Sequence, residues 1–346
     1  MDEDWVIPAA MFVGVQYAIA LSLSVALGFP HIPPLLGYVT IGAMVTVGGG
    51  VWLLLRTLWR LYRSGIDHPA REIAALIASH QRRLAIAILG IQLVVLQMGS
   101  LTWLKTLMPL VVPFWADAYL ANLDAVIFGT DPWRLLTPAL DPIGPFIDAV
   151  YAAWFPIKSF VVAALLISLP SFSKSRAALA YFYTVGIFGV LGQYAFSSAG
   201  PLFYEMAGFG DRFADLEGHL TPAVKAARAY LWQSYVTGGD KIGTGISAMP
   251  SMHVALAAWV ALTLGSAFPR AAPFGWAFLG TILVGSVYLG WHYASDGVAG
   301  VAAAFAAWML AGLTVRAINR RRDTRRRFTA TSIKTAPAAP TTPSTA

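Results

Sequence analysis

Residues 274–316 read FGWAFLGTILVGSVYLGWHYASDGVAGVAAAFAAWMLAGLTVR. The stretch contains two apolar runs, 274–292 and 296–316, and each is close to the ~20 residues with which an α-helix crosses a bilayer. The junction between the runs is short and polar, and it carries His292 and Asp296. The pattern predicts two membrane-spanning helices whose connection places an imidazole and a carboxylate at one surface of the membrane.

Similar apolar runs recur along the whole chain. Of its 346 residues 57% are hydrophobic and only 12% are charged, whereas about 25% of the residues of an ordinary soluble domain are charged. Lipid must cover part of so much apolar surface, so we predict an all-α integral membrane protein with about eight transmembrane helices. The expected spans lie near residues 6–29, 35–56, 84–104, 147–169, 177–198, 250–268, 274–292 and 296–316.

The stretch 113–140 is also apolar, but proline and aspartate residues interrupt it. The interruptions are Pro113, Asp117, Asp124, Asp131 and Pro132. A segment of this kind is expected to lie at the membrane surface rather than to cross the bilayer, with its aromatic side chains at the level of the lipid headgroups. The aromatic residues concerned are Trp115, Tyr119 and Trp133.

The distribution of Lys and Arg orients the predicted helices. Most of the 24 Lys and Arg residues fall on the side of the C-terminal tail, in segments 56–83, 174–176 and 316–334. Cytoplasmic segments carry such an excess, so both termini are expected in the cytoplasm. Segments 199–249 and 292–296 then face the outside. The arginine cluster after the last span is expected to meet anionic lipid, and nucleic acid is not an expected partner.

His253 ends the sequence Pro-Ser-Met-His at residues 250–253, where the sixth apolar run begins. Proline suits the first turn of a helix, because the N–H that it lacks has no partner there. Ser251 can cap the helix, and the free N–H groups of a first turn bind anions. The sequence therefore predicts a histidine beside a place that can hold a phosphate.

His292 and Asp296 are four residues apart, so on a helical turn their side chains share a face. A carboxylate there accepts one imidazole N–H, which leaves the other nitrogen free to attack or to take a proton. Each histidine alone also fits an ordinary polar residue at the membrane surface, and a His–Asp pair can be only a local hydrogen bond. The arrival of both histidines on one side of the membrane, each at a helix end, favours a catalytic site.

Both histidine motifs resemble those of the type 2 phosphatidic acid phosphatase superfamily. Residues 250–253 are similar to its Pro-Ser-x-His motif, and His292-x-x-x-Asp296 is similar to its last motif. More narrowly, residues 128–133 (Phe-Gly-Thr-Asp-Pro-Trp) and 200–205 (Gly-Pro-Leu-Phe-Tyr-Glu) resemble the inositolphosphotransferase branch that contains fungal inositol phosphorylceramide synthase.

The resemblance covers roughly residues 84–315, which implies three parts of the chain. Residues 1–83 would hold two additional transmembrane helices and a basic cytoplasmic loop. Residues 84–315 would form a six-span catalytic core, and residues 316–346 a basic, then disordered cytoplasmic tail. The end of this tail, 329–346, is rich in Ala, Pro, Thr and Ser, a composition typical of disorder.

The resemblance also implies a mechanism. His292 would attack phosphorus to form a phosphohistidine, Asp296 would orient it, and His253 would act as general acid and base. Backbone N–H groups near Ser251 would hold the transferring phosphoryl group. No metal or other cofactor is expected, because the chain has no cysteine and no carboxylate cluster suited to a metal stands out in it.

Two cations that the family's phosphatases carry are missing from this sequence. Those enzymes have a Lys-x6-Arg-Pro motif before the first histidine, whereas residues 198–201 read Ser-Ala-Gly-Pro here. They also have a Ser-Arg pair where this chain has Gly-Ser at 285–286. The losses argue against an ordinary phosphatidate phosphatase and favour transfer between lipids. In the segment that resembles the synthase branch, Gly200, Pro201 and Tyr204 are expected to bind substrate.

Another cation is then expected to neutralise the phosphate. Lys241 in Gly-Gly-Asp-Lys-Ile-Gly (238–243) is the first candidate, and a solvated lysine paired with its neighbour Asp240 is an equally good interpretation. Arg212 and Arg228 are weaker candidates in the same loop. Lys158 falls near the middle of the fourth span, where we expect it to face the bundle interior, meet a polar partner and lie half the membrane away from the histidines.

The preferred function is a lipid phosphotransferase that moves a phosphorylated head group, such as phosphoinositol, from a phospholipid donor to the hydroxyl of a lipid alcohol. A lipid phosphate or isoprenoid diphosphate phosphatase, with water as acceptor, is the nearest alternative. A transporter that uses Lys158 and an intramembrane serine protease with Ser251 as nucleophile and His292 as base are further alternatives. We expect the protein in a bacterial inner membrane, with its active site on the outer, periplasmic side.

Overall fold

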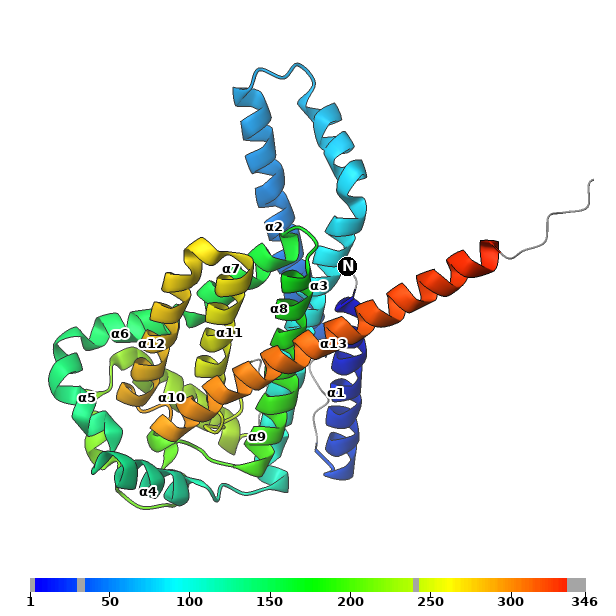
Figure 1. The fold of residues 1–346 in the computed structure, drawn as a ribbon. Helices are drawn as coiled ribbons and strands as arrows, with labels where there is room; N and C mark the ends of the chain where they lie inside the picture. Colours follow the sequence, from blue (N-terminus) through cyan, green and yellow to red (C-terminus); the bar gives the residue numbers. More distant parts are fainter. Residues whose placement is uncertain (1–3, 30–34, 239–242, 335–346) are drawn as a thin grey trace, which may run out of the picture.

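The computed structural model describes residues 4–29, 35–238 and 243–334. This part of the chain is helical and contains no strand (Figure 1). Seven of its helical stretches are long and apolar enough to cross a membrane, and α11 (Met252–Ala267) is a shorter apolar helix. The prediction of an all-α integral membrane protein with about eight spanning helices is confirmed. The seven stretches are α1 (Val6–Ala26), α2 (Leu35–Arg63), α3 (Pro69–Val111), Pro132–Ile167, Phe172–Ala195, Pro269–Tyr288 and Ala294–Thr324.

The short apolar helix α11 lies at the centre of the bundle. Its residues are apolar on every face, a pattern typical of a helix buried on all sides, and each residue from Val254 to Ala261 is 0% or 1% exposed. It packs against α7 (Trp154–Ile167), α8 (Phe172–Tyr183), α12 (Ala272–Tyr288) and α13 (Ala294–Lys334). α11 therefore carries its first turn, with His253, into the interior of the bundle.

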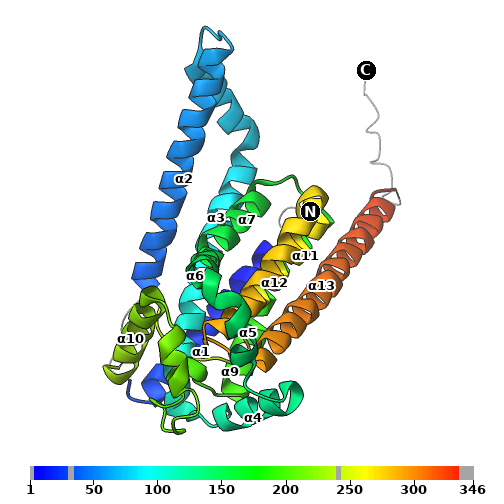
Figure 2. The same cartoon turned by 90° about the vertical axis from the view of Figure 1, so that its left-hand side faces the viewer.

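The two longest helices of the described chain, α3 and α13, extend beyond the bundle (Figure 2). α3 has 43 residues, which is about 65 Å at 1.5 Å per residue and roughly twice the ~30 Å hydrocarbon core of a bilayer. The segment expected as a basic loop is thus mostly helical, because Arg, Leu, Ala and Glu favour helix and Pro69 suits its first turn. Figure 2 shows the α2–α3 connection and the C-terminal end of α13 on one side, with α4 (Asp117–Phe128) at the opposite end.

The C-terminal segment is helical for longer than the sequence predicted. α13 continues to Lys334, so residues 329–334, which were expected to be disordered, belong to this helix. Residues 335–346 lie outside the described part of the chain.

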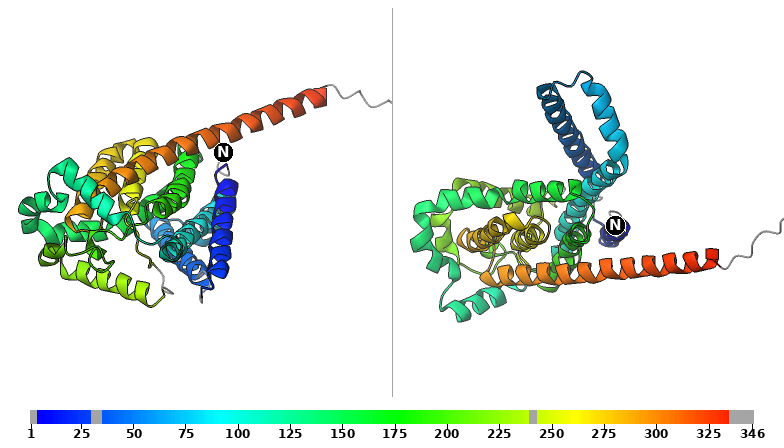
Figure 3. Two further views of the ribbon diagram at one scale, coloured as in Figure 1. Left: turned by 90° about the horizontal axis from the view of Figure 1, so that it is seen from below. Right: turned by 45° about the horizontal axis from the view of Figure 1, so that its top comes forward.

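α1 stands at the edge of the bundle, against α3, α8 and the π-helical turn η2 (Thr184–Gly189) (Figure 3). A buried polar network holds it there. Gln16 donates to the backbone carbonyl of Gly186 at 2.9 Å, Ser100 donates to Gln16 at 3.2 Å, and Gln97 also bonds to Gln16. Such bonds stabilise helix packing where no water can replace them. The first helix is therefore part of the packed bundle.

The stretch 113–140 forms two short helices, α4 and α5 (Pro132–Leu140). Trp115 and Tyr119 are 46% and 56% exposed, as expected of side chains at the headgroup level. Trp133 is only 4% exposed. The ring of His219, at the end of the turn η4 (Ala214–His219), lies 5.6 Å from it, and the Arg134 guanidinium covers it at 4.6 Å. The expectation for Trp133 is wrong because the turn η4 and the side chain of Arg134 cover its ring.

Candidate active site

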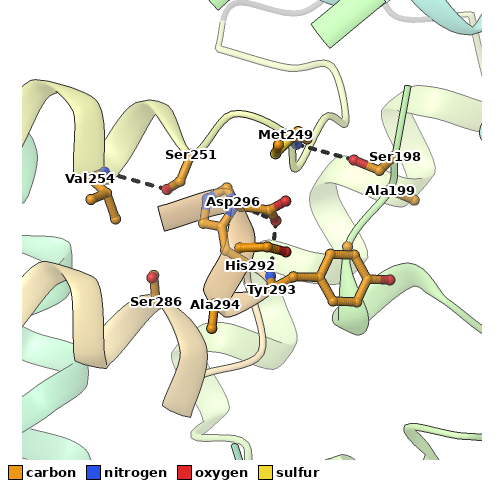
Figure 4. Close-up of polar contacts among 12 residues, drawn as sticks. Ser198, Ala199, Met249, Ser251, Val254, Ser286, His292, Tyr293, Ala294 and Asp296 are labelled. Atoms are coloured by element: carbon orange, nitrogen blue, oxygen red, sulfur yellow. Dashed lines mark hydrogen bonds and ion pairs between the residues drawn. The ribbon is translucent and has the colours of Figure 1, made fainter. Parts of the chain in front are cut away.

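Three loops meet at the end of the bundle where α11 begins (Figure 4). They are residues 196–204, 243–251 and 289–296. Backbone hydrogen bonds connect them in pairs: Ala248 N–H donates to Ser198 at 2.8 Å, Leu202 N–H to Gly290 at 3.0 Å, and Ser251 N–H to Asp296 at 3.0 Å. Residues far apart in the sequence are thereby held in one fixed arrangement around His292.

Ser251 is the N-cap of α11. Its hydroxyl oxygen accepts the N–H of Val254 at 3.4 Å, so the capping predicted for it is confirmed, while its part in substrate binding stays a prediction. The helix begins at Met252. Pro250 therefore precedes the cap instead of occupying the first turn. Its ring packs against Gly192, where a Cβ would lie only 2.4 Å from it. The position predicted for Pro250 is wrong because the serine side chain starts the helix one residue later.

His253 lies in an aromatic pocket inside the bundle. The ring of Trp154 is 4.5 Å from its ring and that of Tyr151 is 5.0 Å away, centroid to centroid. Trp154 Nε1–H also donates to the backbone carbonyl of His253 at 3.0 Å. The third ring around His253 is that of His292, whose centroid is 5.7 Å away. The structure thus brings together two histidines that are 39 positions apart in the chain.

His292 and Asp296 face each other at the start of α13. His292 Nδ1 is 3.5 Å from Asp296 Oδ2, and the side chains are 6% and 0% exposed. Asp296 Oδ2 also accepts the N–H of Tyr293 at 2.9 Å, and the N–H of His292 is bonded to the carbonyl of Ser286 at 3.2 Å. The carboxylate therefore lies on the Nδ1 side of the ring, but no hydrogen bond joins the two groups, since His292 Nδ1 and Asp296 Oδ1 have no hydrogen-bond partner among the described atoms.

Burial decides the protonation state of His292. Burial, and to a smaller extent the positive charge of Lys105, lower the pKa of this imidazole to about 3, while a hydrogen bond with the backbone of Ala248 opposes the change in part. The ring is therefore neutral near pH 7 and has a lone pair to offer. No group of three or more His, Asp and Glu side chains that could hold a metal ion is found among the described residues.

The model of the PAP2 superfamily matches residues 121–310, more than half of the chain. The chain belongs to the PAP2 superfamily. Membership supports a phosphatase-type or phosphotransferase-type activity on lipid phosphates in general. No curated protein and no solved structure matches the chain. The matched region begins within α4 and ends within α13, and it contains both histidine motifs, whereas α1, α2 and α3 precede it.

Two buried aspartates hold the loop 289–296 of this PAP2 protein in place, which carries His292 and is called the histidine loop below. Asp117 accepts the N–H groups of Ala199 and Gly200 and the hydroxyl of Tyr293, each at 2.8 Å. Asp124 accepts the first two N–H groups of α13, from Ala294 at 2.6 Å and Ser295 at 3.0 Å. Burial raises the pKa of both carboxyls, and these hydrogen bonds oppose the rise. Sequence reasoning recognised them only as interruptions, although a buried carboxylate in an apolar stretch needs donors.

The three positions expected to bind substrate lie in different surroundings. Gly200 has a φ of +94°, and a Cβ there would lie 2.8 Å from the carbonyl oxygen of Trp291, so this glycine permits close contact with the histidine loop. Pro201 is buried beside it. Tyr204 is packed against the rings of Phe209 and Phe213 at 5.3 and 5.0 Å. It belongs to an aromatic cluster with these two rings.

The three cationic side chains considered as partners of the phosphate differ in their placement and in their own partners. Lys241 lies outside the described residues. Arg212 is already engaged, because it donates to Asp131 at 2.7 Å, to Asn122 at 2.7 Å and to the carbonyl of Ala121 at 2.9 Å. Arg228 forms an ion pair of 2.6 Å with Glu217. Each of these two arginines is therefore already paired with an acidic side chain of the described chain.

Lys158 lies closer to the histidines than predicted. The expected fourth span is broken at Ala153, so this lysine sits in the second turn of α7 instead of in the middle of one continuous helix. It is 2% exposed, and its ammonium lies 4.4 Å from the ring of Phe155 and 5.2 Å from that of Trp154, which contacts His253. Among the described residues it has no hydrogen bond or ion pair, so the expected polar partner is replaced by aromatic faces.

Lys105 is the residue that sequence reasoning missed. It lies near the end of α3 and is partly buried. Its charge acts on both His253 and His292, and within the described chain no hydrogen bond or ion pair neutralises it. The available signal was a lone lysine just past the apolar run 84–104, on the side predicted to hold the histidines.

Proposed function

We propose that this protein is a membrane-embedded phosphotransferase that moves a phosphorylated head group from a phospholipid to a lipid hydroxyl. The observation that carries the proposal is the 5.7 Å pairing of the His253 and His292 rings, with Asp296 on the far side of His292. A base that faces a nucleophile, with a third group that orients it, is the arrangement of covalent catalysis. PAP2 membership supports the same chemistry.

In the first step, Nε2 of neutral His292 attacks phosphorus and the bond from phosphorus to the lipid oxygen breaks. Protonated His253 gives its proton to that oxygen, so a diacylglycerol leaves and a phosphohistidine remains. Asp296, on the Nδ1 side, stabilises the positive charge that develops on the His292 ring. The free N–H groups at the start of α11 and the cap of Ser251 favour the negative charge of the phosphoryl oxygens.

In the second step, a lipid hydroxyl enters in place of diacylglycerol. Neutral His253 takes the proton of this hydroxyl as its oxygen attacks phosphorus, the bond from phosphorus to Nε2 breaks, and His292 is regenerated. His253 ends the cycle protonated and ready for the next donor. Water in the same position would complete a hydrolysis, so the geometry of the two histidines serves both a transferase and a lipid phosphate phosphatase.

The narrower proposal is an activity like that of inositol phosphorylceramide synthase, with phosphoinositol as the transferred group. It is supported by the segments 128–133 and 200–205 and by the replacement of the phosphatases' Arg-Pro by Gly200 and Pro201. In the structure this glycine is needed for contact with the Trp291 carbonyl, where an arginine side chain has no room.

The test uses purified protein and its His292→Ala variant with labelled phosphatidylinositol or phosphatidic acid, with and without ceramide or diacylglycerol. Label that enters a new lipid only when acceptor is present, and not in the variant, supports the transferase. Release of water-soluble phosphate regardless of acceptor assigns the protein to the phosphatases. Turnover that survives in His292→Ala would contradict the proposed nucleophile.

We also propose that the active site faces the outside of a bacterial inner membrane, with both termini in the cytoplasm. The basic ends of α2 and α13 extend on the side opposite α4, whose Asp117 and Asp124 hold the histidine loop (Figure 2). An excess of Lys and Arg marks the cytoplasmic side. Labelling of introduced cysteines with an impermeant thiol reagent tests this orientation.

A further inference from the structure

A small cleft lies between the end of α3 and α10 (Pro222–Val236), beside the loop that leads to His253. Its volume is about 50 Å³. Phe29, Leu110 and Ile246 are among its apolar lining residues, and Lys105 and Ser234 are among its polar ones. A mixed lining of this kind suits the junction between the chains and the head group of a lipid.

Lys105 is the charge of this cleft. Gly245, at a φ of +94°, lies against its stem, since a Cβ there would be 3.1 Å from Lys105 Cγ and 3.2 Å from its Cβ. The glycine therefore lets the loop 243–251, which leads to His253, pack directly against the side chain of Lys105. The ammonium has no counter-ion in the described chain, although its charge acts on both histidines. A partly buried charge without a partner is costly unless a ligand supplies one.

Ser234 supplies an independent observation. It is 1% exposed, and no described atom accepts or donates a hydrogen bond to its hydroxyl. A serine inside a helix commonly bonds to the carbonyl four residues earlier, as Thr237 does with Gln233 at 2.8 Å. Ser234 instead leaves its hydroxyl unpaired at the cleft. A buried polar group of this kind has the donor that a head-group oxygen needs.

We propose that this cleft is a subsite for the anionic head group of the lipid donor, with Lys105 on a phosphate oxygen and Ser234 on a neighbouring head-group oxygen. The inference rests on the proposed function of the histidine pair and extends it. The lysine comes from α3, which precedes the region shared with the PAP2 superfamily. It provides a positive charge that the absent arginine motifs do not, and it gives the N-terminal helices a part in substrate binding.

The experiment measures KM and kcat for labelled phosphatidylinositol with the full-length protein in mixed micelles. The variants are Lys105→Met, Lys105→Arg and Ser234→Ala. Lys225→Met is the matched control, because this lysine lies on α10 but pairs with Glu217 at 3.1 Å and does not line the cleft. Loss of a charge-assisted hydrogen bond predicts a KM about 10- to 100-fold higher for Lys105→Met. Lys105→Arg should recover much of this loss, Ser234→Ala should raise KM about 3- to 10-fold, and the control should behave as wild type.

A binding measurement separates this inference from the proposed function. Phosphatidylinositol binding is measured at equilibrium in the His292→Ala background, with and without Lys105→Met, and circular dichroism verifies that each variant is folded. Affinity that depends on Lys105 supports the subsite even if no transfer is found for wild type. Equal affinity and equal KM for Lys105→Met and Lys225→Met overturn the subsite, whatever reaction the histidines catalyse.

Discussion

Replacement of Gly200 by alanine tests how the loop 196–204 fits against the histidine loop. A Cβ at this position would lie 2.8 Å from the carbonyl oxygen of Trp291, the residue before His292. Real Cβ atoms essentially never approach so closely, and the obstacle is backbone rather than the flexible end of a side chain. One of the two loops must therefore shift, and the shift is transmitted directly to His292.

The magnitude has two parts, and Gly208→Ala isolates one of them. Both glycines have positive φ, +94° and +89°, which costs a non-glycine residue about 1–3 kcal/mol. Nothing lies within 4 Å of a Cβ at Gly208, so only the backbone cost applies there. The clash at Gly200 adds about 1–3 kcal/mol of overpacking. A displacement approaching 1 Å at the nucleophile lowers the rate by about 10²-fold.

The assay combines thermal unfolding in detergent with initial rates of lipid transfer at a matched folded fraction. Both variants are expected to unfold at lower temperature than wild type, Gly200→Ala at the lowest, and only Gly200→Ala should lose most of its kcat. A Gly200→Ala protein that transfers label as fast as Gly208→Ala would refute the reasoning, because the two loops would then not be tightly coupled.

The remaining predictions concern a carboxylate, the acid stability and the topology. Asp117→Asn replaces an acceptor oxygen by an amide donor that faces N–H or O–H groups, so we expect the free energy of unfolding to fall by about 1.5–3 kcal/mol. An unchanged unfolding temperature would contradict the role of Asp117. Because the pKa of folded His292 is about 3 and that of an unfolded histidine is about 6.5, the unfolded state gains a proton first as the pH falls, and stability is lost from about pH 6.5 downward. His292→Gln should therefore show a smaller drop in unfolding temperature between pH 7 and pH 4 than wild type, and equal drops contradict a buried neutral imidazole. Cysteine at Lys225 should react with an impermeant thiol reagent in intact cells and cysteine at Ser64 only after lysis, and the reverse pattern overturns the orientation.

The spans and the two histidine motifs could be predicted from sequence because their signals are local. Apolar runs of membrane length and the capping serine of Pro-Ser-Met-His each act within one or two helical turns. The pairing of His253 with His292 was also accessible, since two successive spans must return the chain to the same membrane surface. The structure adds the distance between the rings and the aromatic pocket formed by Trp154 and Tyr151.

Most of the misplaced features depend on contacts between distant segments. Asp117 was recognised only as an interruption of the apolar stretch 113–140, whereas its hydrogen-bond donors come from residues more than 80 positions away. Lys158 was placed at mid-depth because the expected fourth span was taken as one helix, although Pro156 has no N–H to donate to the carbonyl of Ala152 and so marks the break at Ala153. The importance of Lys105 follows from packing of α3 beside the loop 243–251, and no motif in either segment signals that contact.

The most direct test of the central claim is to trap the covalent intermediate. Protein is mixed with phosphatidylinositol labelled in its phosphate, without acceptor, and quenched within milliseconds at alkaline pH, where a phosphohistidine survives. The account predicts label on a peptide that contains His292, its absence in His292→Ala, and its transfer to ceramide or another lipid alcohol when this is added before the quench. Label on Ser251, or full turnover with no label on His292, would contradict it.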